Sequence, residues 1–225
     1  EKALNNALVF GKKGGDASVT QQTQALFLKE FPTSSFAKDI YLERGDAAIK
    51  DGRWGEALGS YSAYLKNHGA KKAAATESAR WNVLFMKSRL EGHWRPELNP
   101  ARDVSADLVS ESWKFLEDFP KTTHKSDLVM LLAFRKGATP ADLEKLRKHA
   151  AGDAKSKDLL DEATIVLKAR SSKDLDALVK ANPPAKAKTE LLKEILAKAR
   201  FDIVEKSFQT YTKRPLNYKR FAPSL

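Results

Sequence analysis

The chain has 225 residues, of which 42% are hydrophobic, and it contains no cysteine. This length can bury a sizeable core in one large domain or a short array, and the absence of cysteine excludes a disulfide framework and thiol-based metal sites. The formal net charge of +11 is unevenly placed, because residues 1–120 carry a net +1 and residues 121–225 carry +10. No run of 18 apolar residues occurs, so we expect no transmembrane segment.

The first 35 residues predict two helices. The chain begins at Glu1 without a signal peptide, which predicts a mature form or a fragment. Glycines between residues 11 and 15 end the first helix, Pro32 stops the second, and Ser34 offers an N-cap for the next helix. The apolar positions of the first helix are Leu4, Ala7, Leu8 and Phe10, and in the second helix Ala25, Leu28 and Phe31 are expected to point inward.

Residues 36–72 predict two helices that pack together through a tight turn at residues 51–53. Apolar residues recur every three or four positions in both helices, which places them on one face of each. These residues are Ile40, Tyr41, Gly45, Ala48 and Ile49, followed by Ala57, Leu58, Tyr61, Tyr64 and Leu65. The small residues among them predict a close approach of the two helices, with tyrosines filling the seam.

The end of the second helix recurs along the chain. The segment 27–35 (FLKEFPTSS) is echoed by 64–72 (YLKNHGAKK) and by 115–123 (FLEDFPKTT). The leucines of the three copies, Leu28, Leu65 and Leu116, are 37 and 51 residues apart. A period of 37 residues is typical of helical repeats, and the longer spacing predicts an insertion of about 14 residues near residues 91–100.

At residues 36–72 the chain resembles the tetratricopeptide repeat (TPR). The matching positions are Tyr41, Gly45, Gly52, Ala57, Tyr61 and Leu65, whereas Arg44 replaces a usual leucine and Gly69 replaces a usual proline. The resemblance implies a right-handed solenoid of antiparallel helix pairs, with about three pairs in residues 1–125. It also implies that the first helix of each pair lines a concave groove for a peptide or partner helix. On the best repeat that face holds Asp39, Leu42, Asp46 and Ile49.

The second half predicts further helices of a less regular kind, so the expected fold class is all-α. Residues 126–212 form a basic helical region that continues the array, and residues 213–225 form an extended basic tail. Thr139-Pro140 begins a helix, and the prolines at 183 and 184 break the chain before a long final helix from Ala185 to about Thr212.

Two further segments are predicted to contact a partner protein. Trp94 and Arg95 lie in the proline-bounded loop of residues 92–100, and a tryptophan beside an arginine is a frequent interface anchor. The tail contributes four basic residues, Lys213, Arg214, Lys219 and Arg220.

Residue patterns for catalysis or cofactor binding are weak. The histidines at 68, 93, 124 and 149 are scattered without zinc-site spacing, so we expect surface positions, no metal and no cofactor. No phosphate-loop or nucleophile-elbow motif occurs. Glu77-Ser78 and Glu111-Ser112 match the Glu-Ser pair of lytic transglycosylases, but the glycine-rich segments of that family are missing. We therefore expect no enzymatic activity.

The basic second half admits a nucleic-acid hypothesis. A stripe of positive side chains would neutralise phosphates, and its members are Lys145, Arg147, Lys148, Lys155, Lys157, Lys168 and Arg170. Interspersed acidic residues and few aromatic side chains favour a solvated surface instead. An acidic protein or an anionic membrane surface is an intermediate interpretation for residues 126–225.

The segment 31–37 (FPTSSFA) before a glycine-containing helix pair is similar to repeats of bacterial envelope proteins. These include the Tol-Pal-associated periplasmic coordinator and the lipoproteins of outer-membrane barrel assembly. The resemblance covers residues 1–125 and implies a noncatalytic scaffold that binds a partner protein in the periplasm or cell envelope, although the composition leaves the cytoplasm open. The alternatives are the helical superhelix domain of a cell-wall lytic enzyme and a nucleic-acid-binding helical array.

Overall fold

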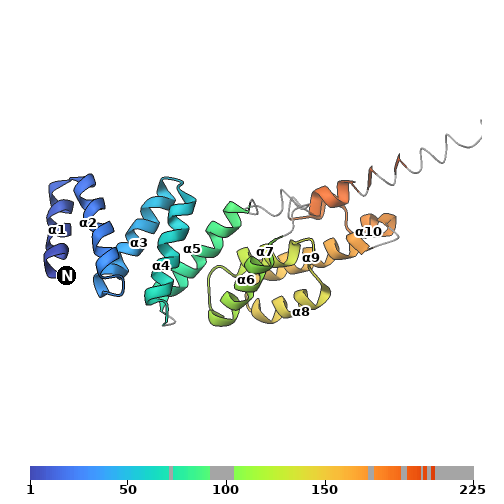
Figure 1. Cartoon of the computed structure of the whole chain (residues 1–225). Coiled ribbons are helices and arrows are strands. Elements are labelled where there is room, and N and C mark those ends of the chain that lie inside the picture. Colours follow the sequence, from blue (N-terminus) through green and yellow to red (C-terminus); the bar gives the residue numbers. More distant parts are fainter. Residues whose placement is uncertain are drawn as a thin grey trace, which may run out of the picture. The chain divides into compact units, whose positions relative to one another are not determined.

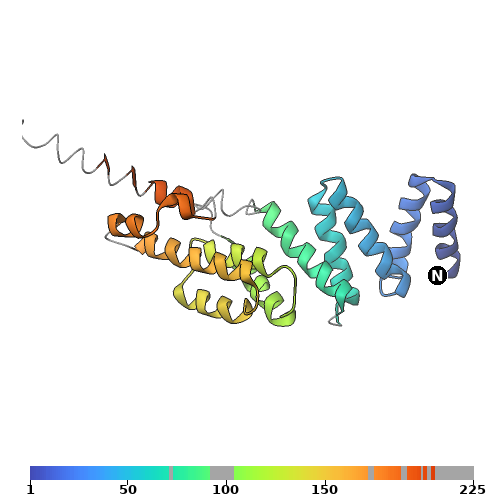
Figure 2. The ribbon, with the colours of Figure 1, turned by 180° about the vertical axis from the view of Figure 1, so that it is seen from behind.

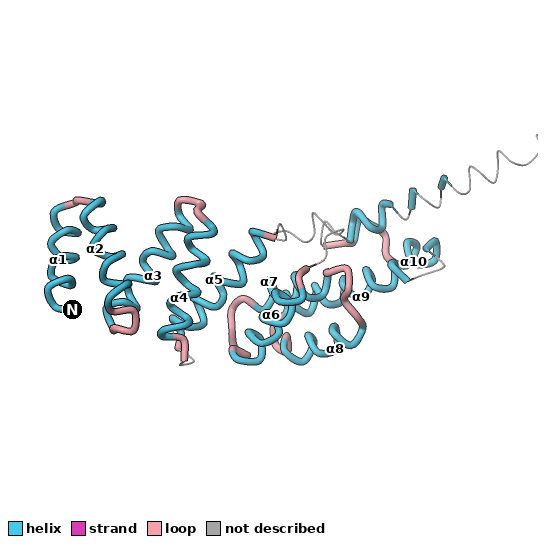
Figure 3. Tube along the Cα trace, viewed as in Figure 1, coloured by secondary structure: helices cyan, strands magenta, loops and turns pink. Residues whose placement is uncertain are grey.

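The structure is a computed structural model that describes residues 1–70, 73–91, 104–171, 175–188, 192–198, 200–201 and 204–205. Every regular element in these ranges is a helix, and none of them contains a strand (Figure 3). The all-α prediction is therefore confirmed. The chain forms two compact units: the described residues of unit 1 end at His124, and those of unit 2 begin at Lys125.

Unit 1 consists of six helices among its described residues. They are α1 (Lys2–Gly14), α2 (Ala17–Glu30), α3 (Ser35–Lys50), α4 (Trp54–His68), α5 (Ala74–Leu90) and α6 (Ala106–Asp118). Consecutive helices pack against each other, most extensively α3 on α4 and α4 on α5. Helix α3 lies between α2 and α4, as the two opposite views agree (Figures 1 and 2).

Local side-chain chemistry sets the ends of these helices. The side chain of Asp16 caps α2 by accepting a hydrogen bond from the Val19 N–H at 3.0 Å, and Ser34 caps α3 through the Phe36 N–H at 3.2 Å. Gly15 and Gly52 both have φ of +70°, a conformation that favours glycine. The turn predicted at residues 51–53 is therefore confirmed.

The contact between α3 and α4 is centred on Gly45 and Tyr61. A Cβ atom added at Gly45 would lie 2.7 Å from the Tyr61 Cζ atom, so the aromatic ring occupies the space that glycine leaves. Ala57 is fully buried beside them. We expected the small residues to let the two helix backbones approach closely. At Gly45 the reason for a small residue is instead the Tyr61 ring, which leaves no room for a side chain there.

The turns after α2 and α6 have the same backbone conformation. Phe31 has φ −132° and ψ 54°, and Phe119 has φ −127° and ψ 67°. Each carbonyl accepts a hydrogen bond three residues on, from the Ser34 N–H at 3.1 Å and from the Thr122 N–H at 3.0 Å. The repeated segments FPTSS and FPKTT thus fold alike, as residues that carry the same cap sequence are expected to do.

The repeated helix ends are built on aromatic residues, not on leucine. A buried ring and a second ring four residues later lie in contact in all three copies, with centroids 5.0–5.9 Å apart. These pairs are Phe27 with Phe31, Tyr64 with His68, and Phe115 with Phe119. The repeated leucines differ in burial, because Leu28 and Leu65 are only partly buried and Leu116 is buried.

One inward position predicted for α2 is wrong. Ala25 is exposed, whereas Phe27 and Gln24 are buried. Among the apolar residues of α1, Leu8 is buried and Phe10 is 72% exposed. The spacing of apolar residues predicted the helices correctly. It did not predict which side of each helix packs against a neighbouring helix.

Unit 2 is organised around α7 (Lys125–Phe134), which is buried around most of its circumference. The other helices named in this unit are α8 (Pro140–His149), α9 (Ala154–Ser171) and α10 (Leu175–Ala181), followed by a 3₁₀ turn at Pro184–Lys186. Both α7 and α8 pack on α9. The predicted final helix does not begin at Ala185. It is helical over residues 192–198, where Leu192 and Leu196 are buried.

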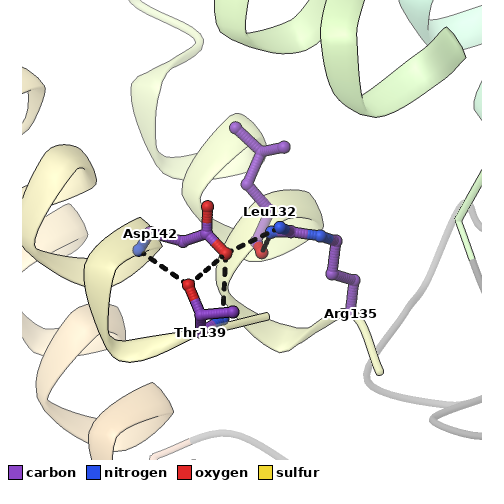
Figure 4. Close-up of polar contacts among 4 residues, drawn as sticks. All are labelled: Leu132, Arg135, Thr139 and Asp142. Carbon is purple, nitrogen blue, oxygen red and sulfur yellow. Dashed lines mark hydrogen bonds and ion pairs between the residues drawn. The ribbon is translucent and has the colours of Figure 1, made fainter. Parts of the chain in front are cut away.

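A polar network joins the end of α7 to the start of α8 (Figure 4). Thr139 Oγ1 accepts a hydrogen bond from the Asp142 N–H at 3.2 Å, and the Thr139 N–H donates to Asp142 Oδ2 at 2.9 Å. The Arg135 guanidinium donates to the same carboxylate oxygen at 2.7 Å and also to the Leu132 carbonyl. This reciprocal cap confirms the helix start predicted at Thr139-Pro140.

Candidate functional site

Unit 1 carries an open groove of about 580 Å³ where α2, α3 and α4 meet. We call it the α2–α4 groove. Its lining residues are Gln21, Gln24 and Leu28 from α2, Tyr41, Glu43, Arg44 and Ala47 from α3, and Arg53, Glu56, Gly59, Ser60 and Ala63 from α4 and the turn before it. The lining combines polar and charged side chains with small residues.

The α2–α4 groove does not include the residues predicted to line a concave face. Asp39 and Asp46 are exposed, and Leu42 and Ile49 are partly buried against the core of unit 1. At 100° per residue, these four positions lie on roughly the opposite side of α3 from the groove-lining residues. The four remain a prediction, whereas the groove is a second surface that the repeat template did not indicate.

Asp46 is engaged within the protein. Its carboxylate accepts a hydrogen bond from the Tyr61 hydroxyl. Burial raises the pKa of Tyr61, and the hydrogen bond to the Asp46 carboxylate raises it further, so the hydroxyl stays a donor. Asp46 therefore positions the ring that fills the space at Gly45, in addition to any contact with a partner.

Most charges in the groove are paired. Lys12 Nζ lies 2.6 Å from a Glu43 carboxylate oxygen, and Arg53 pairs with Asp51 at 2.7 Å and also with Glu56. Arg44 has no hydrogen-bond or ion-pair partner within the described part of the chain. Its side chain is exposed, so it is the charged group of the groove that can pair with an incoming molecule.

The sequence shows Arg44 only as a departure from the leucine of the repeat and gives no sign of Gln24. A charged residue at a position where the repeat has a core residue is the signal that indicates Arg44. Gln24 is 8% exposed on an otherwise core-facing side of α2, and only the packing of neighbouring helices reveals it.

Two glycines of α4 have open space beside them in the described part of the chain. A Cβ atom at Gly55 or at Gly59 would meet no heavy atom within 4 Å. Glycine in a helix interior costs about 0.5–1 kcal/mol relative to alanine. Gly59 lies in the groove and Gly55 does not, so the pair offers a matched comparison of groove and non-groove positions.

A second hollow of about 460 Å³ lies between α4, α5 and α6. Two ion pairs cross it or border it, Arg80 with Asp118 and Lys87 with Glu111, both at 2.5 Å. Arg80 also lies over the Phe119 ring at 5.3 Å. Ion pairs between α5 and α6 therefore join the helices around this second hollow.

The two Glu-Ser candidates lie on different helices, α6 and α5. Glu111 pairs with Lys87 as described, and the neighbouring Ser112 is fully buried. Glu77 is partly buried near the start of α5, and Ser78 is exposed.

Two of the histidines are partly buried and contact neighbouring rings. The His68 ring centroid is 6.1 Å from that of Tyr41 and 5.9 Å from that of Tyr64, and its Nε2 atom is 3.1 Å from the Pro32 carbonyl oxygen. His124 stacks on Trp81 with ring centroids 4.0 Å apart. Within the described residues, no group of three or more His, Asp or Glu side chains is arranged to hold a metal ion.

The basic stripe predicted for unit 2 is partly engaged. Arg147 donates to Asp161 at 2.9 Å and to Thr164 at 3.0 Å, which ties α8 to α9. Lys157 lines an opening of about 450 Å³ between these helices together with Arg147. The predicted contacts at Trp94, Arg95, Lys213, Arg214, Lys219 and Arg220 lie outside the described residues.

None of the helices in the described part of the chain combines the length and apolar character that crossing a membrane requires. Comparison with protein-family models, curated proteins and solved structures finds no match to this chain.

Proposed function

We propose that the chain is a noncatalytic scaffold of TPR-like helix pairs that holds a segment of a partner protein in the α2–α4 groove. On this proposal unit 1 is a right-handed solenoid of antiparallel pairs. The partner is a protein of the bacterial cell envelope, in line with the resemblance of residues 1–125 to envelope repeat proteins.

The observation that carries the proposal is the repeated construction of unit 1. The ring pair at the end of α2 recurs at the ends of α4 and α6, and the turn after α2 recurs after α6. Helices that repeat in this way bury a face only against their neighbours. Grooves consequently form where successive pairs meet, and the α2–α4 groove is one of them.

The composition of the α2–α4 groove favours a protein segment over a polyanion. Two arginines, Arg44 and Arg53, and two glutamates, Glu43 and Glu56, give the lining a formal charge of zero. A surface for nucleic acid needs an excess of positive charge to displace counterions. A mixed lining with an apolar component suits a peptide, which brings both polar groups and side chains of several kinds.

The test is affinity capture from bacterial envelope extract with the intact chain and two variants of α4. Gly59→Leu adds a side chain inside the groove, and Gly55→Leu makes the same change on the same helix outside it; at both positions a Cβ atom meets no heavy atom within 4 Å. We expect the captured protein, identified by mass spectrometry, to be lost with Gly59→Leu and kept with Gly55→Leu. Circular dichroism would establish that both variants stay folded.

Equal capture by the two leucine variants would remove the groove as the binding site. The same experiment can include Trp94→Ala and a truncation after Thr212, which address the two other predicted contacts. Loss of the partner with either of these changes, and not with Gly59→Leu, would move the proposed contact to residues 92–100 or to the basic tail.

A further inference from the structure

We infer that the occupant of the α2–α4 groove is an extended acidic segment, with a carboxylate paired to Arg44 and a main-chain peptide group paired to the Gln24 amide. This inference rests on the proposed function and specifies the chemistry of the partner. It concerns the groove formed by α2, α3 and α4, which is on the other side of α3 from Asp39, Leu42, Asp46 and Ile49.

The charge requirement follows from the ion pairs. Glu43 is paired with Lys12, and Glu56 with Arg53, so these charges are already compensated within the protein. Arg44 is left without a partner in the described residues. Its planar guanidinium matches a carboxylate in a two-point hydrogen-bonded contact. The groove is complementary to a segment that brings one acidic group to this position.

The place for a peptide group follows from Gln24. Its residue is 8% exposed, and no described residue makes a hydrogen bond with its side chain. Its polar atoms are not among the fully buried side-chain atoms that lack a partner, so the amide is accessible from the groove that Gln24 lines. The amide offers an acceptor oxygen and two donor hydrogens, and a main-chain peptide group supplies one matching donor and one matching acceptor.

An extended segment fits this pairing better than a helix does. Main-chain N–H and C=O groups within a helix already bond to each other, whereas those of an extended chain are available to side chains. Gly59, Ala47 and Ala63 give parts of the lining little or no side chain, so a backbone can approach closely there. The three features together specify an extended chain with an acidic residue.

The experiment is selection of a phage-displayed library of random 12-residue peptides on the intact 225-residue chain. The selected peptides should share an acidic residue at one aligned position. Selection on Arg44→Glu should replace that preference with Lys or Arg. Lys50→Glu makes the same charge reversal on an exposed α3 position outside the groove, and it should leave the acidic preference unchanged.

A peptide from the first selection then measures the role of Gln24. Its affinity should fall about tenfold or more with Gln24→Leu, because a peptide group loses its partner. Gln22→Leu, the same change at an exposed position of α2 outside the groove, should leave the affinity within about twofold. Circular dichroism and thermal unfolding of each variant would separate loss of binding from loss of folding.

The outcomes distinguish this inference from the proposed function. If Gly59→Leu abolishes peptide binding but Arg44→Glu and Gln24→Leu do not change it, the groove binds a segment and the inferred chemistry is wrong. If Gly59→Leu has no effect, the proposed function itself is wrong. Acidic peptides whose binding ignores Arg44→Glu would indicate attraction to the basic second half, and would also overturn the inference.

Discussion

The two units differ in how their helices bury apolar side chains. In unit 1, helices such as α3 and α4 bury one side and keep another exposed, and aromatic rings recur at equivalent helix ends. In unit 2, α7 is a short apolar helix buried around most of its circumference. Helices that bury one side leave open space beside them, such as the α2–α4 groove, where Arg44 is exposed.

The largest effect is expected from a cavity at the centre of unit 2. Leu132 is 0% exposed in α7, and Leu132→Ala should lower the free energy of unfolding by about 2–5 kcal/mol. Leu90→Ala, at an exposed position of α5, should cost little. Hydrogen exchange should show faster opening in unit 2 alone. Faster exchange throughout unit 1 as well would mean that the two units unfold together, and the contrast drawn between them would be wrong.

The next effect concerns the space at Gly45. Gly45→Ala places a methyl group 2.7 Å from the Tyr61 ring and should cost about 1–3 kcal/mol, measured by urea unfolding. In the background of Tyr61→Leu the same change should cost much less, because the ring is gone. Additive costs in the double variant would show that Tyr61 is not the reason for the glycine.

The cap of α8 predicts a pH dependence specific to unit 2. Burial by itself would raise the pKa of Asp142, but hydrogen bonds from Thr139 and the Arg135 charge outweigh it and lower the pKa below its usual value. A lowered folded pKa contributes stability that is present above the unfolded pKa of about 3.9. This contribution is lost as the pH falls through the folded pKa.

Asp142→Ala should therefore reduce stability at pH 7 by about 0.5–2 kcal/mol, with a smaller difference from the unsubstituted chain at pH 2. Glu144→Ala, at an exposed position of the same helix, provides the control. Urea unfolding at the two pH values measures both. A difference that is constant with pH would mean that the Asp142 charge does not stabilise the cap.

The smallest effect is a gain in stability. Gly59→Ala should stabilise unit 1 by about 0.5–1 kcal/mol, because alanine favours a helix and its methyl group meets nothing. A loss of stability, seen as a lower melting temperature, would show that the open space at Gly59 is filled within the chain. The expected gain at Gly59 contrasts with Gly45, where the same substitution is expected to lower stability.

Helix boundaries could be predicted from sequence because their causes are local. Ser34 and Thr139 cap helices through bonds to residues two or three positions away, and Gly52 adopts the turn conformation that its neighbours require. The same holds for the repeated Phe-Pro turns, whose copies fold alike. The start of the final helix was misjudged, since residues after the two prolines first form a 3₁₀ turn.

The candidate site could be predicted only in part. The departure of Arg44 from the repeat pattern was visible, but the side of α3 on which a groove forms was not, nor was the burial of Gln24. The Leu28 and Phe27 positions show the reason. Both are apolar and adjacent, and only the approach of neighbouring helices places Phe27 in the core and Leu28 at the groove.

The sequence by itself determined that this chain is helical, where most helices begin and end, and which helix ends repeat. Those properties depend on hydrogen bonds and apolar spacing within a few residues. The tertiary structure decided that Tyr61 fills the space at Gly45, that Asp46 holds Tyr61, and that Arg44 and Gln24 face one groove. These depend on how close separate helices approach, which is set by the packing of all their side chains at once.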